Sequence, residues 1–477
     1  MKKKVFVLSL LSVLGIGLLT SCSGDDDDNN EKGGTVETSE TATQTVSDAP
    51  LMDETNDSLS NYEFTKIVRI ELNGTSATVK NNVSGVAAVI GTGIVNITST
   101  ASNVEYIISG TYSGSVNIEG KPIAKVTLNG ANITNEKGVA LNLTIPKVFF
   151  HTVGGTTNSC TATLTKENHA ALYCNGKLVF YGKGTLNITS NNGSGISAMY
   201  GITAKETTFN IKSGYDGIRS ADHHIFLNSG TYNVEAAKWG ICTRIIKSGS
   251  ASRNTDHYIV MNGGTYNITA TGRDGYGICA YSLLTINGGN ITISAYNSAI
   301  YGVSGLIING GNTHAKSTAG NSIMAFDLYV KGGTTTAIAQ HEKMAAILST
   351  KKTFVITGGT LIGIGANDNV SLPTAESTQP SVVLGKNDAS YRFGATLMNI
   401  QSSTGGSEVI TYQIPQSYTT LFVSSPKLSK GTTYNIYTGG SHSGTSTNGI
   451  YSGGTYTKGK SNGSFTTATA APYVTEK

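Results

Sequence analysis

The stretch Gly263-Gly-Thr-Tyr-Asn-Ile268 recurs through the middle of this chain of 477 residues, and it decides the fold. Its other copies and variants are Lys183–Ile188, Thr207–Ile211, Ser229–Val234, Gly288–Ile293, Gly310–Ala315, Gly332–Ala337 and Gly358–Gly363. The steps between equivalent positions of successive copies, from Gly184 through Thr207 and Gly230 to Gly359, are 23, 23, 34, 25, 22, 22 and 26 residues. A self-similar unit of this length is typical of a solenoid, in which each turn buries its apolar face only against its neighbours.

Each copy also has the alternation of a half-buried strand. Tyr266 and Ile268 are apolar, whereas Asn267 between them is polar and belongs to the opposite face. Two more short apolar segments complete each repeat, as Gly277–Cys279 and Leu284–Asn287 do in the fourth. Three short strands per repeat, with glycine at the corners, predict an all-β chain folded as a right-handed parallel β-helix. Leucine-rich repeats are excluded because the chain lacks their Leu-x-x-Leu-x-Leu frame and their helical segment.

The beginning of the chain predicts export. Lys2, Lys3 and Lys4 precede the apolar run Val5–Leu19, which is a pattern typical of a signal peptide. The ending Leu19-Thr-Ser-Cys22 resembles a bacterial lipobox. The resemblance implies that Cys22 becomes the lipidated N-terminus and that this lipid anchors the protein to the outer membrane. The acidic run after Cys22 resembles an export signal for the cell surface. Loss of the three lysines lowers the net charge from +4 to +1, so the charge gives no argument for nucleic acid as a partner.

Composition and pattern together predict seven segments. They are a lipoprotein signal peptide at 1–21, a disordered acidic and polar tether at 22–60, an N-terminal cap with the first strands at 61–119, the parallel β-helix at 120–370, a linker at 371–380, a small C-terminal antiparallel β domain at 381–440, and a tail rich in Gly, Ser and Thr at 441–477.

Several motifs, in this order, resemble one family. They are Ile70–Gly74, Ile94–Ile97, Ile107–Thr111, Val126–Ile133, the repeated Ile-Asn-Gly-Gly turns and Gly431–Gly440. The chain resembles the calcium-binding parallel β-helix carbohydrate-binding domain family over roughly residues 61–440. The resemblance implies a fold similar to that of pectate lyases, an exported bacterial protein, and a polysaccharide partner such as cellulose or an acidic pectic chain.

The resemblance also implies calcium as a cofactor, held by an Asp-Asp-Gly-Ile motif followed by another acid. Only Tyr215-Asp216-Gly217-Ile218 with Asp222 keeps that form here, and Asp274 is the other acid expected nearby. Carboxylates are oxygen ligands that calcium prefers. The sequence therefore predicts a metal site at Asp216, Asp222 and Asp274, and the alternative is that these are solvated turn acids.

Aromatic residues replace the acid in two later repeats. Trp239 and Tyr276 stand directly before Gly-Ile, where Asp216 stands one repeat earlier, and Tyr215 precedes Asp216. Adjacent strands lie about 4.8 Å apart, so these rings are expected to form a row along the solenoid. An exposed row would bind sugar rings, and the cations Lys238, Arg244 and Arg273 would favour an acidic sugar. The alternative is that the rings pack in a corner beneath the insertion Thr243–Asp256.

Three functions remain open. The first is a surface lipoprotein that binds polysaccharide without cleaving it, and it has no catalytic residues. The second is a calcium-dependent lyase acting on uronate polymers, which would combine the three aspartates with Arg219 or Arg273 as the base. The third is a structural or adhesive stalk. Loss of the family's acids, with aromatic replacement, favours binding over catalysis.

Overall fold

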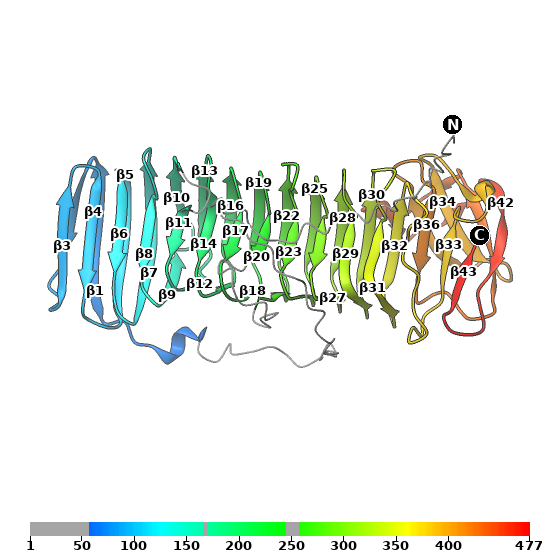
Figure 1. The fold of residues 1–477 in the computed structure, drawn as a ribbon, viewed down its shortest axis with the longest axis horizontal. Helices are drawn as coiled ribbons and strands as arrows, with labels where there is room; N and C mark the ends of the chain where they lie inside the picture. The colour runs from blue at the N-terminus through cyan, green and yellow to red at the C-terminus, as the bar shows by residue number, and fades with distance from the viewer. Residues whose placement is uncertain (1–56, 166–168, 245–256) are drawn as a thin grey trace, which may run out of the picture. The chain divides into compact units, whose positions relative to one another are not determined.

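The computed structural model describes residues 57–165, 169–244 and 257–477. Within these ranges nearly every regular element is a β-strand, and the helical pieces are two 3₁₀ turns, η2 (Leu59–Asn61) and η3 (Ala389–Tyr391). No helix in the described ranges is long and apolar enough to cross a bilayer. The strands stack as a β-solenoid of about 11 turns, which confirms the predicted parallel β-helix (Figure 1). The signal segment, most of the tether and residues 245–256 lie outside the described residues.

Each turn contributes one strand to each of three parallel sheets. The first sheet contains β10 (Thr157–Ala162), β13 (Thr185–Ser190), β16 (Thr208–Ser213), β19 (Thr231–Ala236), β22 (Thr265–Ala270), β25 (Asn290–Ala295), β28 (Asn312–Ser317), β30 (Thr334–Ala339) and β32 (Thr360–Gly365). The second contains β4 (Ile94–Ser99), β6 (Ser115–Glu119), β8 (Leu141–Thr144), β11 (Ala170–Cys174), β14 (Ser194–Ala198), β17 (Ile218–Ser220), β20 (Ile241–Thr243), β23 (Ile278–Ala280) and β26 (Ile300–Gly302). The third contains β9 (Lys147–Thr152), β12 (Lys177–Tyr181), β15 (Ile202–Ala204), β18 (Ile225–Leu227), β21 (Ile259–Met261), β24 (Leu283–Ile286) and β27 (Gly305–Ile308).

Four longer strands turn a corner between two sheets. β5 (Val104–Ser113) and β7 (Ile123–Asn135) serve the third and first sheets, and β29 (Ile323–Val330) and β31 (Ile347–Ile356) serve the second and third. The solenoid therefore keeps three flat sides even where the repeat pattern in the sequence weakens.

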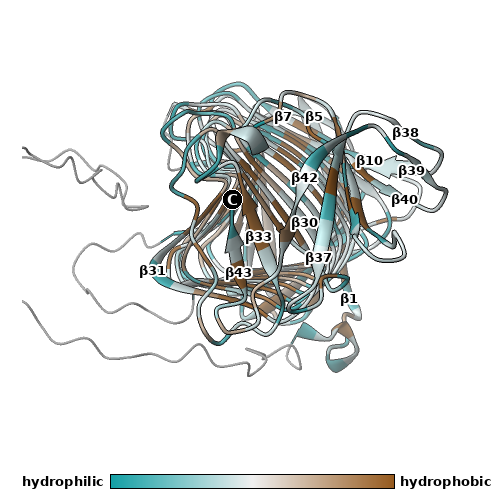
Figure 2. Cartoon of the chain, turned by 90° about the vertical axis from the view of Figure 1, so that its right-hand side faces the viewer, coloured by the Kyte–Doolittle hydropathy of each residue, from teal (hydrophilic) through white to brown (hydrophobic). Residues whose placement is uncertain are grey.

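Like side chains stack inside the solenoid. Phe209, Tyr232 and Tyr266 follow one another on β16, β19 and β22, each at most 1% exposed, with ring centroids 5.2 and 4.7 Å apart. Burial of one such side chain stabilises a fold by about 1.5–3 kcal/mol. The apolar interior between the three sheets is visible in Figure 2. The alternating residues of each copy thus supply one continuous core rather than a core per repeat.

Antiparallel hairpins close the N-terminal end. β1 (Lys66–Gly74) pairs with β2 (Ser76–Lys80), and β3 (Val86–Gly91) pairs with β4. Parallel pairing already starts between β1 and β5. The segment 61–119, expected as a cap with the first strands, therefore contains the opening turns of the solenoid together with the hairpins that cover its edge.

The predicted C-terminal antiparallel β structure is present in two parts. β36 (Thr420–Ser424) pairs with both β32 and β33 (Ser381–Leu384), and β43 (Val474–Glu476) pairs with β33. A separate sheet has the order β39 (Thr445–Thr447), β40 (Ile450–Ser452), β35 (Glu408–Gln413), β34 (Leu397–Ser402), β37 (Thr433–Thr438) and β42 (Lys460–Thr466). A two-strand ribbon joins β38 (Ser441–His442) to β41 (Tyr456–Thr457). Residues 441–477, expected as a tail, thus belong to these sheets.

The first described residues are pinned to the flank of the solenoid. The carboxylate of Asp57 lies 3.2 Å from Nζ of Lys147 and 2.5 Å from Nζ of Lys177, and it accepts a hydrogen bond of 2.7 Å from the hydroxyl of Thr203. Its side chain is 4% exposed. Just downstream, the ring of Tyr62 packs on Phe149 with centroids 5.1 Å apart. Asp57 therefore fastens the N-terminal segment across β9, β12 and β15.

Candidate functional site

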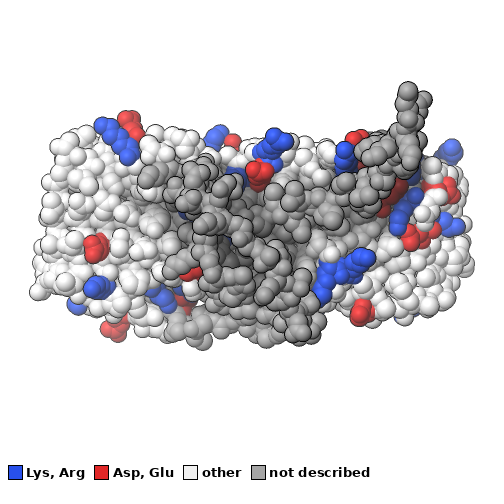
Figure 3. Space-filling model, viewed as in Figure 1, with Lys and Arg blue, Asp and Glu red and all other residues white. Residues whose placement is uncertain are grey.

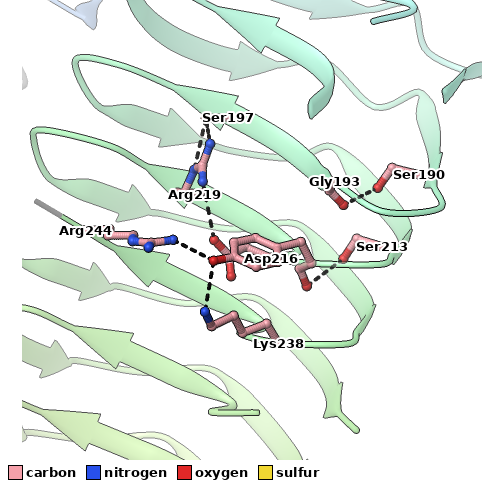
Figure 4. A network of polar contacts seen from close by, with 9 residues as sticks. Ser190, Gly193, Ser197, Ser213, Asp216, Arg219, Lys238 and Arg244 are labelled. Carbon is pink, nitrogen blue, oxygen red and sulfur yellow. Dashed lines mark hydrogen bonds and ion pairs between the residues drawn. The ribbon is translucent and has the colours of Figure 1, made fainter. Parts of the chain in front are cut away.

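The predicted site around Asp216 is a buried polar cluster (Figure 4). Asp216 precedes β17 and its side chain is fully buried, with Oδ2 lying 3.7 Å from a terminal nitrogen of Arg219. Arg219 also donates two hydrogen bonds of 3.2 Å to the hydroxyl of Ser197 on the preceding turn. Burial raises the pKa of Asp216, whereas Arg219, Arg244 and Lys238 oppose that rise. Asp216 thus takes part in an internal ion pair.

The aromatic residues surround that cluster rather than form an exposed row. Trp239 is 3% exposed, Tyr276 6% and Tyr215 8%. Trp239 lies edge-on to Tyr276, with centroids 6.2 Å apart, and its indole N–H donates to the carbonyl of Asp274. The predicted neighbourhood of Trp239 and Tyr276 is confirmed. The prediction that their faces are exposed for sugar stacking is wrong, because corner packing covers them.

The predicted cations are engaged in the same cluster. Nζ of Lys238 and a terminal nitrogen of Arg244 donate to the hydroxyl of Tyr215 at 2.9 and 3.0 Å. Both cations also lie 5.3 Å from the ring centre of Trp239. Arg273 is exposed. Of the three cations expected to favour an acidic sugar, only Arg273 therefore points away from internal partners.

The three predicted metal ligands do not gather. Asp216 pairs with Arg219, while Oδ1 of Asp222 lies 3.6 Å from Nε2 of His257. Asp274 is an exposed corner residue. In the described parts of the chain, no three His, Cys, Asp or Glu side chains come together in a way that can hold a metal ion. The donor set does not fit calcium. The predicted cluster of Asp216, Asp222 and Asp274 is wrong, because Asp216 is paired inside the fold, Asp222 lies beside His257 and Asp274 is exposed at a corner.

A different surface has the regularity of a binding site. The outward side chains of β13, β16, β19, β22, β25, β28 and β30 are aligned in columns, because these strands pair in parallel without a register shift. We call this surface the asparagine face. Its middle column is Asn187, Asn210, Asn233, Asn267, Thr292, His314 and Thr336.

The asparagines of that column form a hydrogen-bonded ladder. Each side-chain amide donates to the amide oxygen of the preceding turn, at 2.9 Å from Asn210 to Asn187, 2.8 Å from Asn233 to Asn210 and 2.8 Å from Asn267 to Asn233. An amide has two N–H donors and an oxygen with two lone pairs. The ladder uses one N–H donor and one oxygen lone pair of each interior asparagine. Each of these side chains therefore keeps one N–H donor and one lone pair for a ligand.

The asparagine face is shallow and nearly uncharged. A hollow of about 430 Å³ lies over its first four strands. Lys212 and Glu235 lie beside the ladder, 3.1 Å apart in an ion pair. Across the side of the molecule seen in Figure 3, charged residues likewise occur singly or in small mixed groups. The surface offers hydroxyls and amides rather than a field of one sign.

The C-terminal sheet bounds this face. The hairpin β39–β40 lies to one side of the stacked strands in Figure 2, and its turn residue Asn448 lines two hollows on the first sheet. The larger, about 410 Å³, is lined by His314, Lys316, Ile338, Gln340, Tyr412, Gln413, Pro415, Gln416, Asn448 and Gly449. The smaller, about 240 Å³, is lined by Asn312, Thr313, Thr334, Thr336, Thr447, Asn448, Ile450 and Ser452.

Comparison with known proteins identifies a family for this chain. The chain belongs to the family described as carbohydrate-binding domain-containing protein, whose model matches residues 92–450. That range includes both the asparagine face and Asn448. Among solved structures the chain is similar to the polysaccharide lyase-like protein from C. thermocellum, solved as a gadolinium derivative, with 20% identity over 56% of this chain and 93% of that chain and a TM-score of 0.38. No curated protein matches.

The sequence contained signals for the asparagine face, and the hypothesis of an aromatic binding row did not use them. Asn187, Asn210, Asn233 and Asn267 fall on the polar face of successive strands, which is enough to predict a ladder once the strands are in register. The hairpin also had a signal, since Asn448-Gly449 between short β segments is typical of a two-residue turn. Nothing in the sequence indicated that this hairpin reaches the first sheet.

Proposed function

We propose that this protein is a non-catalytic carbohydrate-binding protein that docks an extended polysaccharide on the asparagine face. The family to which the chain belongs supports a carbohydrate ligand. The single observation that carries the choice of surface is the amide ladder with its unused donors and acceptors. Sugar hydroxyls both donate and accept hydrogen bonds. Rungs about 4.8 Å apart present such partners repeatedly along a chain-like ligand.

The face favours a neutral glycan. The Lys212–Glu235 pair cancels its own charge, and Lys238 and Arg244 donate to Tyr215 within the buried cluster. Of the three cations that the sequence analysis expected to favour an acidic glycan, only the exposed Arg273 is therefore left to do so. We place the ligand on the amide and hydroxyl columns, where recognition depends on hydrogen bonds rather than on long-range attraction.

Binding without cleavage is supported by the acids of this face. A glycosidase needs two carboxyl groups flanking the scissile bond. Among the outward residues of the asparagine face, Glu235 is the only acid, and it is paired with Lys212. A lyase would need clustered carboxylates for a metal and a nearby base. The described residues supply no such cluster.

The chain offers a matched pair of variants for testing this surface. Asn233→Ala with Asn267→Ala removes two members of the ladder on the asparagine face. Asn262→Ala with Asn287→Ala removes two members of a corner ladder, in which Asn262 donates to Asn228 at 2.6 Å and Asn287 donates to Asn262 at 2.7 Å. The first double variant loses two side-chain hydrogen bonds and the control loses three, since Asn309 also donates to Asn287, so weaker glycan binding by the first variant alone reports on the ligand and not on lost hydrogen bonds.

The measurement is binding to an array of plant, fungal and bacterial polysaccharides, followed by titration with the glycan bound most tightly. We expect the Asn233/Asn267 variant to bind at least tenfold more weakly, about 1.4 kcal/mol, and the Asn262/Asn287 variant to bind like the natural protein. Equal binding by both variants would move the site elsewhere. A protein that binds no glycan on the array would refute the proposed function.

We further propose that the protein is a lipoprotein of the outer membrane exposed at the cell surface. The motive is the lipobox-like ending at Cys22 and the acidic run that follows it. These residues lie outside the described ranges. A surface anchor places the asparagine face where polysaccharide outside the cell can reach it.

A further inference from the structure

The asparagine face is open along most of its length but is closed at its C-terminal end, where the C-terminal sheet covers the strands. Its outward residues are exposed along β22 and β25, half-buried at His314 and Lys316 of β28, and buried at Thr336 and Ile338 of β30. On the next strand the outward Ile362 and Ile364 are 0% exposed. They belong, with Ile338, to the core of the C-terminal sheet. A chain lying along the solenoid cannot continue past β30.

A rigid hairpin forms the wall at that point. Asn448 and Gly449 have φ values of 51° and 84°, as a two-residue turn between β39 and β40 requires. The backbone N–H of Gln413 donates to the carbonyl of Gly449 at 2.7 Å, and β40 pairs with β35 at Tyr412. The turn is therefore fixed to the C-terminal sheet.

The larger hollow under this hairpin, which we call the end hollow, is built for a polar ring. Its volume of about 410 Å³ lies in the range of about 300–1,000 Å³ typical of small-ligand sites. Donors and acceptors come from both walls, with Lys316 on the solenoid and Gln413, Gln416 and Asn448 on the C-terminal sheet. The exposed Pro415 supplies apolar surface, whereas Tyr412 and Ile338 line the hollow but are only 1% and 3% exposed. This combination of amides, an ammonium and a small apolar patch suits a hexopyranose ring.

We propose that the end hollow binds the terminal sugar of a glycan whose preceding residues lie on the asparagine face, so that the protein captures chain ends rather than chain interiors. This inference rests on the proposed function. The terminal sugar is distinguished by a free hydroxyl where the next residue would be attached. An internal residue carries a further sugar at that position, and the wall of β39–β40 leaves that sugar no path.

Chain length separates the two binding modes without any mutation. The probes are cello-oligosaccharides and oligogalacturonides of three to eight residues, together with longer soluble fractions of the polysaccharide that binds most tightly on the array. All probes are compared at equal mass. For chains long enough to fill the asparagine face, capture of ends predicts that the protein bound per gram falls in inverse proportion to chain length, while the affinity per chain stays constant. Oligosaccharides reduced to alditols, and others methylated at the non-reducing end, then show which end enters the hollow.

Two substitutions and a control test the residues. Lys316→Met removes the ammonium but keeps the stem, and Asn448→Gly removes the amide while retaining a residue that tolerates a positive φ. Lys121→Met is the control, because Lys121 is exposed in the turn between β6 and β7 and lies outside both the asparagine face and the end hollow. We expect tenfold or greater loss of affinity for short oligosaccharides in the first two, less than threefold in the control, and, above neutral pH, an unchanged melting temperature in all three.

The outcomes separate this inference from the proposed function. Glycan binding that is proportional to mass rather than to chain number overturns end capture and leaves the proposed function intact. The same holds if Lys316→Met and Asn448→Gly bind like the control. If no probe or array glycan binds at all, both proposals fall together.

Discussion

At the scale of single residues, His314 links the chemistry of the end hollow to pH. Burial lowers its pKa from the usual value of 6.5, and Lys316 on the same strand lowers it further. Its Nδ1 lies 2.7 Å from the hydroxyl of Thr336. A histidine with a depressed pKa stabilises the fold above the unfolded value near 6.5, and that contribution is lost as the pH falls through the folded pKa.

Lys316→Met removes the neighbouring positive charge, so the pKa of His314 should rise toward its usual value. Stability near pH 6 should then depend less on pH. Titration of the imidazole by NMR measures the shift directly, and the exposed His169, in the turn before β11, serves as an internal reference. An unchanged pKa of His314 would mean that burial alone sets it.

For Asp216, the sequence predicted the position in the fold but not the side-chain contacts. Its position before a Gly-Ile strand predicted its place in the turn, and the phase of Trp239 one turn later predicted their closeness. Arg219 was expected near the aspartates as a lyase base, but its buried ion pair with Asp216 was not predictable. Arg219, Lys238 and Arg244 have long side chains that can point either inward or to solvent. Their inward direction depends on three neighbouring turns at once. The metal and sugar hypotheses failed at that step.

At the scale of elements, the glycine before a second-sheet strand allows neighbouring turns to stack closely. A Cβ on Gly240 would lie 2.3 Å from Cγ2 of Ile268 and 2.5 Å from the carbonyl oxygen of Gly277. Both neighbours belong to the following turn. The close approach therefore couples successive rungs, which explains why glycine recurs at Gly195, Gly217 and Gly277.

Gly240→Ala should accordingly destabilise the protein by about 1–3 kcal/mol, the usual cost of overpacking. Gly154→Ala is the control, since its added Cβ would meet only Cβ of Lys183 at 3.9 Å. The control should change stability by no more than about 0.5 kcal/mol. Chemical denaturation of both variants measures the difference, and equal midpoints would show that the turns can shift apart without loss.

Elements were predictable where the repeat is regular and less so beyond it. The strands from Lys183 to Gly363 follow a period of two within repeats of 22–26 residues, apart from the one lengthened by an insertion, so their faces and order come from the sequence. The strands after Gly440 are two to seven residues long in a region rich in Gly, Ser and Thr, where composition resembles a loop. Their pairing with β35 and β37 is a long-range choice that no local pattern contains.

At the scale of the whole molecule, the proposed anchor gives a separate prediction. Cys22→Ala should release the protein into the soluble fraction or leave its signal segment uncleaved, because the thiol is the proposed site of lipidation. Fractionation of cells and the mass of the mature N-terminus measure both results. Unchanged membrane association with Cys22→Ala would remove the lipid anchor from this account while leaving the glycan proposals untouched.

The attachment of Asp57 has a mechanical consequence. If a tether from the cell surface pulls on the chain, the force reaches the solenoid at Lys147, Lys177 and Thr203 rather than at the start of β1. A pull at the start of β1 would peel strands away one hydrogen bond after another. A pull at Asp57 instead loads three neighbouring turns together, so a cell held to polysaccharide by this protein would strain these inner turns before the terminal hairpins.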